Sequence, residues 1–241
     1  RAEETDMVGM ANGLAYTPMG GDLLPVETTI TSGKGKVTLT GQLGDVIKES
    51  ATAGITYVRS RSLAFGLEPD FYEHVDFHLH FPEGAVPKDG PSAGVTNVTS
   101  LISALLAAPI RKDVAMTGEI NLRGKVLPIG GLKEKVLAAY RAEIKIVICP
   151  KENEKDLHEV PKNVLKAIEF KYVDSLDEVL RVALAPLPED HPNQALRNFI
   201  GGQGEAKIDD WREVRDWLKQ RKEQEERARD TARESVPHGP H

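Results

Sequence analysis

A long apolar run that follows directly on a proline-containing loop constrains the fold of this chain more than any other feature. The loop reads Pro-Lys-Asp-Gly-Pro-Ser-Ala-Gly over residues 87–94, and the apolar run extends from Ala93 to Ala108. Apolar residues occupy nearly every side of this run, which predicts a helix that is buried all round and ends before Pro109. The apolar fraction of 40% is large enough to supply a core around it.

Ser92 is predicted to lie at the point where the loop becomes this helix. Serine is a strong N-cap residue, so one interpretation is that its side chain only caps the helix. The same place suits a nucleophile, because helix N-termini present unpaired N–H groups and a partial positive charge that stabilise an oxyanion. This stretch alone leaves both interpretations open.

Strand and helix signals intermix along the chain without regular βαβ repetition. Alternating or continuous apolar patterns predict strands, and spacing at the helical period predicts helices. The predicted strands are 24–30, 36–40, 74–81, 113–117, 125–129 and 144–149, and the first two are expected to form a hairpin across residues 32–35. The predicted helices are 44–65, 93–108, 132–142 and one opened by the capping box 175–178. The mixture indicates an α+β fold with a mixed sheet.

Changes in composition divide the chain into three parts. Residues 1–14 are polar and small and are predicted to be a linker, and residues 15–186 form the domain. Residues 187–241 begin with a breaker-rich linker and continue as a charged helical tail that contains Trp211 and Trp217. These tryptophans could dock the tail on the domain or on a neighbouring subunit. Since the chain does not begin with Met, we expect it to be a piece of a longer, processed or cloned protein.

Composition also limits the functional class. A net charge of −6 argues against a dedicated nucleic-acid binder. No apolar run is long enough for a membrane helix, and the charged start is not a signal peptide. The single cysteine, Cys149, lies in an apolar run, excludes an internal disulfide framework and fits a reducing compartment. We therefore expect a cytoplasmic protein.

Two further patterns suggest ligand binding but are incomplete. A phosphate-binding P-loop needs a glycine five residues before Gly35, where Ile30 stands, so no ATPase site of that kind is expected. His74, His78 and His80 share one face of a predicted strand. A His-x-His pair binds zinc only with further ligands, and no obvious set completes it. We therefore expect no metal and interpret these histidines as a polar surface near the site, with His80 in a supporting role.

The residues around Ser92 match the G-x-S-x-G nucleophile elbow, but the context of that motif is missing. The elbow needs a buried strand that leads directly into the serine, and Pro87 and Pro91 occupy that place. A lysine that is desolvated enough to lose its proton can activate a serine instead. Lys133 and Lys135 lie among apolar residues of one predicted helix, and periodicity does not choose between them. Either could also be a solvated lysine with a packed stem.

Three sequence blocks, in this order, resemble the proteolytic domain of Lon, the ATP-dependent protease. They are residues 87–94, the segment Met-Thr-Gly-Glu-Ile over 116–120, and Leu-Pro-Ile-Gly-Gly-Leu-Lys-Glu-Lys over 127–135. The resemblance extends from about Gly13 to Leu184. It implies that Ser92 is the nucleophile and Lys135 its base. Other residues that it implies in supporting positions are Thr117, hydrogen-bonded to the dyad, and Asp89 and Glu119 near the site.

The resemblance also implies an activity and an assembly. A Lon proteolytic domain is a compact α+β unit of a homohexameric ring and acts as a serine endopeptidase of the endopeptidase La type. Its substrates are unfolded proteins or peptides, and the complete protease degrades misfolded and regulatory proteins. The familiar Lon carries an ATPase module that this chain lacks, so ATP and Mg are expected only there and no cofactor is expected here. The alternative is a non-catalytic Lon-like assembly or binding module, which predicts a broken dyad, whereas both members are present.

Overall fold

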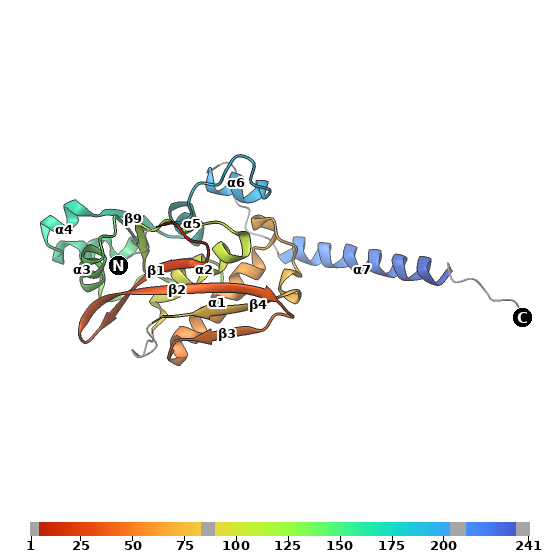
Figure 1. Ribbon diagram of the computed structural model, residues 1–241, viewed down its shortest axis with the longest axis horizontal. Coiled ribbons are helices and arrows are strands. Elements are labelled where there is room, and N and C mark those ends of the chain that lie inside the picture. The colour runs from red at the N-terminus through yellow and green to blue at the C-terminus, as the bar shows by residue number, and fades with distance from the viewer. Residues whose placement is uncertain (1–4, 83–89, 203–210, 235–241) are drawn as a thin grey trace, which may run out of the picture.

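The structure is a computed structural model that describes residues 5–82, 90–202 and 211–234. Among these residues, seven strands form one mixed sheet in the order β3-β4-β2-β1-β5-β8-β9 (Figure 1). Strands β1, β5, β8 and β9 are parallel neighbours, whereas β2 pairs antiparallel with both β1 and β4. The strands are β1 (Met10–Thr17), β2 (Gly20–Ser32), β3 (Val37–Thr40), β4 (Val75–His80), β5 (Val114–Met116), β8 (Ile146–Pro150) and β9 (Glu169–Val173). The predicted α+β fold with a mixed sheet is confirmed.

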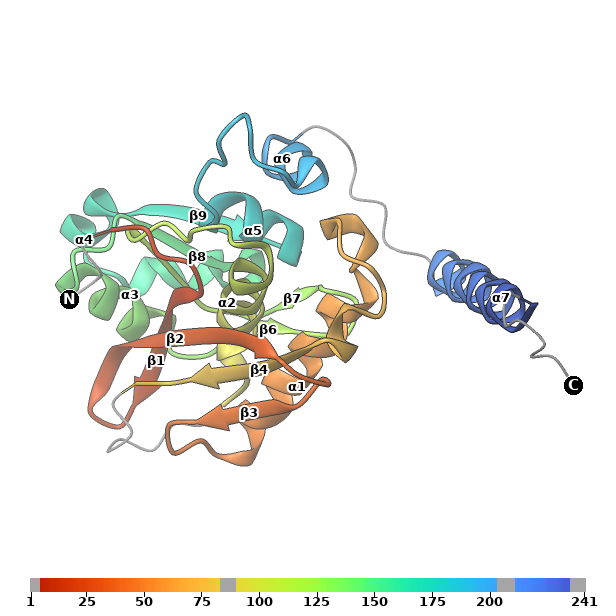
Figure 2. The ribbon, with the colours of Figure 1, turned by 45° about the vertical axis from the view of Figure 1, so that its right-hand side comes forward.

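Helices cover both faces of this sheet (Figure 2). The helices are α1 (Asp45–Ser60), α2 (Gly94–Leu106), α3 (Leu132–Arg141), α4 (Lys162–Ala167), α5 (Leu176–Ala183), α6 (Gln194–Ile200) and α7 (Trp211–Glu234). Four 3-10 segments join them in the described ranges: η1 (Leu63–Phe65), η2 (Phe71–Glu73), η3 (Pro91–Ala93) and η4 (Lys151–Glu159). A short hairpin of β6 (Glu119–Ile120) and β7 (Val126–Leu127) stands apart from the main sheet.

Alternate residues of the central strands enter two separate hydrophobic clusters. Ala115 of β5 faces one cluster with α3 and α4, and its neighbours Val114 and Met116 face the other with α1, α2 and α5. This alternation follows from the two-residue period of a strand. The continuous apolar run of β8 is buried at every position, as predicted for a strand covered on both faces. Helices α2 and α3 therefore lie on opposite faces of the sheet.

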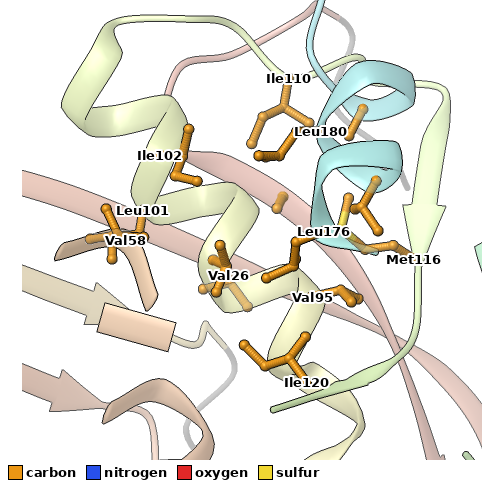
Figure 3. Close-up of a cluster of buried hydrophobic side chains, with 14 of the residues drawn as sticks. Val26, Val58, Val95, Leu101, Ile102, Ile110, Met116, Ile120, Leu176 and Leu180 are labelled. Carbon is orange, nitrogen blue, oxygen red and sulfur yellow. The ribbon is translucent and has the colours of Figure 1, made fainter. Parts of the chain in front are cut away.

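Helix α2 is the buried helix that the sequence predicts. Val95, Leu101 and Ile102 are at most 1% exposed and point into a cluster that includes Leu176 and Leu180 of α5 (Figure 3). Three of the polar side chains on the helix, Thr99, Ser100 and Ser103, make hydrogen bonds within the fold. One example is Ser100, whose hydroxyl donates to the Gly9 carbonyl at 2.7 Å. A polar group that is paired in this way can be buried at little cost.

The hairpin predicted for residues 24–40 is wrong. Strands β2 and β3 do not pair with each other, because β4 lies between them and pairs with both. The glycine-rich turn instead wraps around the start of β4. Asp76 accepts hydrogen bonds from the N–H groups of Lys34 and Lys36, both at 2.9 Å, and these bonds lower the pKa of its carboxyl. The turn that suggested phosphate binding thus holds a carboxylate of the protein itself.

Buried residues lie on both sides of the predicted domain bounds at residues 15 and 186. Residues 10–14, expected in a linker, form the first part of β1, with Ala11 and Leu14 buried in the core. Beyond Pro186, the predicted linker contains α6, whose Leu196 and Phe199 are buried. These apolar side chains pack because η1 and α5 leave a surface for them, and Phe65 meets the Phe199 ring edge-on with 5.7 Å between ring centroids.

The charged C-terminal helix predicted from the sequence is present as α7. Its Arg221 pairs with Asp70 at 2.7 Å and with Glu68 at 3.2 Å, both in the segment between η1 and η2. The Arg221 guanidinium also lies 5.1 Å from the centre of the Trp217 ring. The tail therefore contacts its own domain through an arginine, with a tryptophan beside it. None of the helices in the described ranges has the length and hydropathy of a membrane span.

Candidate active site

Ser92 lies in the 3-10 turn η3, directly before α2 begins at Gly94. Of the two interpretations that the sequence left open, the helix cap is not observed, because neither η3 nor α2 has a side-chain cap hydrogen bond. The physical reason is Pro91, which starts the turn one residue earlier, as proline favours the first positions of a helix. Ser92 is half-buried, and its hydroxyl is not used as a cap.

Lys135 is the buried lysine of helix α3. It is 2% exposed, whereas Lys133, the alternative that the sequence left open, is only partly covered. The Lys135 amine donates a hydrogen bond to the Thr117 hydroxyl at 3.2 Å. Burial lowers the pKa of Lys135 from 10.5 to about 8, because desolvation disfavours the charged form. The structure thus distinguishes two lysines that periodicity could not.

The segment that follows β5 joins the serine and the lysine. Thr117 is fully buried and accepts the hydrogen bond from Lys135. The next residue, Gly118, donates its N–H to the Ser92 carbonyl at 2.9 Å and accepts from the Val95 N–H at 3.1 Å. The β5 end therefore fixes the Ser92 turn through its backbone and the Lys135 amine through a side chain.

Asn153 holds the loop that leads into α3 and was not found from the sequence. Its side-chain oxygen accepts from the Ile129 N–H at 2.9 Å, and its amide nitrogen donates to the Ile129 carbonyl at 2.8 Å. The same nitrogen donates to Asp156 at 2.8 Å, and Asn153 is 3% exposed. The Asn153 side chain thus pairs with both backbone groups of Ile129, as the backbone of a neighbouring strand would. A single asparagine in a highly charged stretch gives no sequence signal for such a role.

The other predicted supporting residues lie in three different surroundings. Glu119 begins β6, immediately after Gly118, and is partly buried. The Nδ1 atom of His80 lies 2.7 Å from the Thr40 hydroxyl, and within the described ranges no hydrogen bond joins this ring to Ser92 or Lys135. Asp89 lies outside the described residues. The roles of these three residues remain predictions.

The histidine face of β4 is polar, as its alternation predicts, but it does not form a cluster of metal ligands. The hydroxyl of Thr40 lies 2.9 Å from His78 Nε2 as well as within hydrogen-bond distance of His80. In the part of the chain that the structure describes, no group of three or more histidine, cysteine or acidic side chains could hold a metal ion. Cys149 is buried, and burial together with Glu154 raises the pKa of its thiol to about 12. Such a thiol is unreactive.

The arrangement around Ser92 and Lys135 occurs in a region that matches a known family. The sequence model of the Lon protease (S16) C-terminal proteolytic domain matches residues 1–186. The chain belongs to this family. The Lon match includes the serine, the lysine and the β5 end between them, whereas α6 and α7 lie beyond it.

Individual Lon proteases support this assignment. The chain is 58% identical over 189 residues to Lon protease 1 of Syntrophobacter fumaroxidans and 61% identical over 182 residues to the Lon protease of Nitratidesulfovibrio vulgaris. The Lon protease of Chloroflexus aggregans is 57% identical over 193 residues. These alignments cover 78%, 76% and 80% of this chain but only 23%, 22% and 23% of those proteins. The chain thus spans less than a quarter of the length of these Lon relatives.

Proposed function

We propose that this Lon domain is a serine endopeptidase in which Ser92 is the nucleophile and Lys135 its general base. The observation that carries the proposal is the buried Lys135 amine, bonded to Thr117 on the segment that also holds the Ser92 turn. A lysine serves as a base only when its neutral form is populated. A non-catalytic binding module would have no need for a lysine buried at this place.

The lowered pKa makes the base available near neutral pH. With a pKa of about 8, about a tenth of the Lys135 amines are neutral at pH 7. With the ordinary value of 10.5, the neutral fraction would be roughly one in three thousand. Burial therefore increases the population of the active base by roughly 300-fold at this pH. The hydrogen bond to Thr117 holds the amine nitrogen in the position from which it accepts the serine proton.

The reaction then follows the usual course of acyl transfer. Neutral Lys135 takes the hydroxyl proton of Ser92, whose oxygen attacks the peptide carbonyl carbon and forms a tetrahedral intermediate. The N–H groups of Gly94 and Val95 already donate to Pro91 and Gly118, so the oxyanion is assigned to N–H groups earlier in the Ser92 turn. Protonated Lys135 passes the proton to the leaving amine as the C–N bond breaks. Water, deprotonated by the same lysine, then attacks the ester carbonyl; the bond between the acyl carbon and the Ser92 oxygen breaks, the lysine returns its proton to that oxygen, and the acid is released.

The wider setting of this activity is inferred from the Lon relatives. We assign unfolded protein segments and peptides as substrates, and a homohexamer as the assembly, because the domain resembles Lon over its whole matched region. ATP and Mg are assigned to a linked ATPase module in the full-length protein rather than to this domain. The glycine-rich turn here supports that assignment, because Asp76 already accepts its Lys34 and Lys36 N–H groups. Glu119, Asp89 and His80 are proposed as supporting residues.

Covalent labelling followed by intact-mass spectrometry tests the dyad. A serine-directed β-lactone is expected to add once to the wild-type chain and not to Ser92→Ala. Lys135→Ala should lose the adduct, because the serine then has no base, whereas Lys133→Ala on the same helix should keep it. A wild-type chain without an adduct, or peptidase activity retained in Ser92→Ala, would contradict the proposal and favour the non-catalytic module.

A further inference from the structure

The β1–β2 turn, taken here to include the first residues of β2 (residues 20–22), meets helix α3 at Glu134 and Lys135, the proposed base. At Gly21 the two backbones are so close that a Cβ atom there would lie 2.0 Å from the Glu134 carbonyl oxygen and 3.0 Å from the Lys135 nitrogen. Ordinary carbon–oxygen contacts are at least about 3.3 Å. Any side chain at this position must therefore separate the two backbones, at Gly21 and at the first turn of α3, by about 1 Å.

The need for glycine at this position comes from space and not from backbone conformation. Gly21 does not have a left-handed φ, so its backbone is open to any residue. It pairs with Tyr16 in the β1–β2 ladder, which fixes how far the turn extends over α3. Only the missing side chain lets the strand lie against the helix at Glu134.

Two more contacts hold the same surfaces together. Gly131, the residue before α3, has φ +69° and lies under Tyr16, where a Cβ atom would be 2.8 Å from the tyrosine ring. At the other end of the helix, the Arg141 guanidinium donates to the Gly21 carbonyl at 2.7 Å. The β1–β2 turn thus contacts the start of α3 through Tyr16 and Gly21 and its end through Arg141.

We propose that Gly21 is a positioning residue for Lys135: by leaving no side chain between the β1–β2 turn and α3, it sets the depth at which the lysine amine is buried beside Thr117. This inference rests on the proposed function, since it concerns the environment of the proposed base. It assigns the β1–β2 turn a role in tuning the base, beyond its place in the sheet.

The charged groups around the contact do not account for the state of the lysine. The charged residues on the two elements are Asp22 in the turn and Lys133, Glu134 and Arg141 on α3. The cause of the lowered pKa of Lys135 is burial, which disfavours the charged amine. Depth of burial is therefore the quantity that a displacement of α3 would change.

The test measures the lysine directly, without reference to catalysis. Lysine labelled with ¹⁵N at Nζ and ¹³C at Cε is titrated by NMR, and the Lys135 signal is identified by its loss in Lys135→Met. The wild-type amine is expected to titrate near 8, and in Gly21→Ala the midpoint should move toward 10.5 because water reaches the displaced amine. Gly130→Ala is the matched control, because a Cβ atom there has no neighbour within 4 Å and its φ is ordinary.

A second variant keeps the test informative if Gly21→Ala folds poorly. Arg141→Met removes the hydrogen bond to Gly21 from an exposed side chain and is expected to shift the midpoint in the same direction by a smaller amount. An unchanged Lys135 midpoint in both Gly21→Ala and Arg141→Met, or an equal shift in Gly130→Ala, would overturn the inference.

Labelling of Ser92 by the β-lactone separates this inference from the proposed function. A displacement of about 1 Å at a catalytic group can cost on the order of 100-fold in rate, so Gly21→Ala should be labelled on the order of 100-fold more slowly at pH 7. If the Lys135 midpoint shifts while wild-type Ser92 takes no label at any pH, the positioning role stands and the peptidase proposal fails. If wild-type Ser92 is labelled and the Lys135 midpoint does not move in Gly21→Ala or Arg141→Met, the peptidase proposal stands and the positioning role of Gly21 fails.

Discussion

The two halves of the candidate site are fixed in different ways. The Ser92 turn lies beside α2 on one face of the sheet and is held by backbone hydrogen bonds to Gly118, with its side chain half-buried. Lys135 comes from α3 on the opposite face and is held by burial and by one side-chain hydrogen bond to Thr117. The serine half costs the fold little. The lysine half requires a charged group to lose its water, so stability and reactivity oppose each other there.

The largest expected effect concerns the lysine half. The pKa of Lys135 is about 8 in the folded chain, below its ordinary value of 10.5. Below pH 8 the folded state bears the full cost of the buried charge, roughly 3 kcal/mol, and between 8 and 10.5 stability rises with pH because the unfolded state binds more protons. Lys135→Met should therefore unfold with a higher free energy than wild type at pH 7, by up to roughly 3 kcal/mol.

Urea denaturation at pH 7 and at pH 10 measures this gain. The difference between Lys135→Met and wild type should shrink at the higher pH, where the wild-type amine is neutral. Ser92→Ala is the comparison from the serine half. Because it keeps Lys135, the difference between its free energy of unfolding and that of wild type should be the same at pH 7 and pH 10. If Lys135→Met were less stable than wild type at pH 7, the buried lysine would not destabilise the fold, and the proposed difference between the lysine half and the serine half would be contradicted.

The next effect concerns the hydroxyl that connects the lysine to β5. Thr117→Val keeps the shape of the side chain but removes the acceptor of the Lys135 hydrogen bond. A hydrogen bond to a charged group is worth about 1.5–3 kcal/mol, so labelling of Ser92 should slow by roughly 10- to 100-fold. Thr117→Ser retains the hydroxyl and should react at close to the wild-type rate. Equal rates for the valine and serine variants would show that the backbone alone positions the site.

The smallest effect is expected far from both halves, at the contact of α7. Arg221→Ala removes the ion pairs with Asp70 and Glu68, of which the Glu68 pair is exposed. An exposed pair contributes less than about 1 kcal/mol, but the Asp70 carboxylate is only 12% exposed, so the free energy of unfolding should fall by about 1–2 kcal/mol while Ser92 labelling stays unchanged. Limited proteolysis should cut α7 faster in this variant than in Lys222→Ala. A change in the labelling rate would mean that the tail influences the site.

The sequence predicted the elements whose signal is local. Helix α2 and the capping box at Ser175 follow from patterns within a few residues, and both are confirmed. The site was predicted through resemblance rather than through physics, because periodicity could not separate Lys133 from Lys135. The structure separates them, since only the depth of α3 in its cluster decides which lysine loses its water.

What the sequence did not predict depends on contacts between distant segments. Strand β4 pairs between β2 and β3, and its Asp76 accepts hydrogen bonds from a turn about forty residues earlier in the chain. Strand β9, to which no pattern was assigned, is recruited by its parallel pairing with β8. Asn153 and Gly21 act on α3 across the fold, one through its amide and one through having no side chain. Patterns within a short stretch of sequence cannot predict such contacts, because the contacting residues lie far apart in the chain.

Helix α6 has a consequence for where the folding unit ends. The Lon match stops at residue 186, yet Leu196 and Phe199 beyond it are part of the main core and cover Phe65. Asn193 adds a hydrogen bond from its side chain to the Phe65 carbonyl at 2.8 Å. A chain cut at the family boundary would expose an aromatic surface that the intact chain buries, and such surfaces promote self-association. In this chain the packed core thus extends past the end of the Lon match.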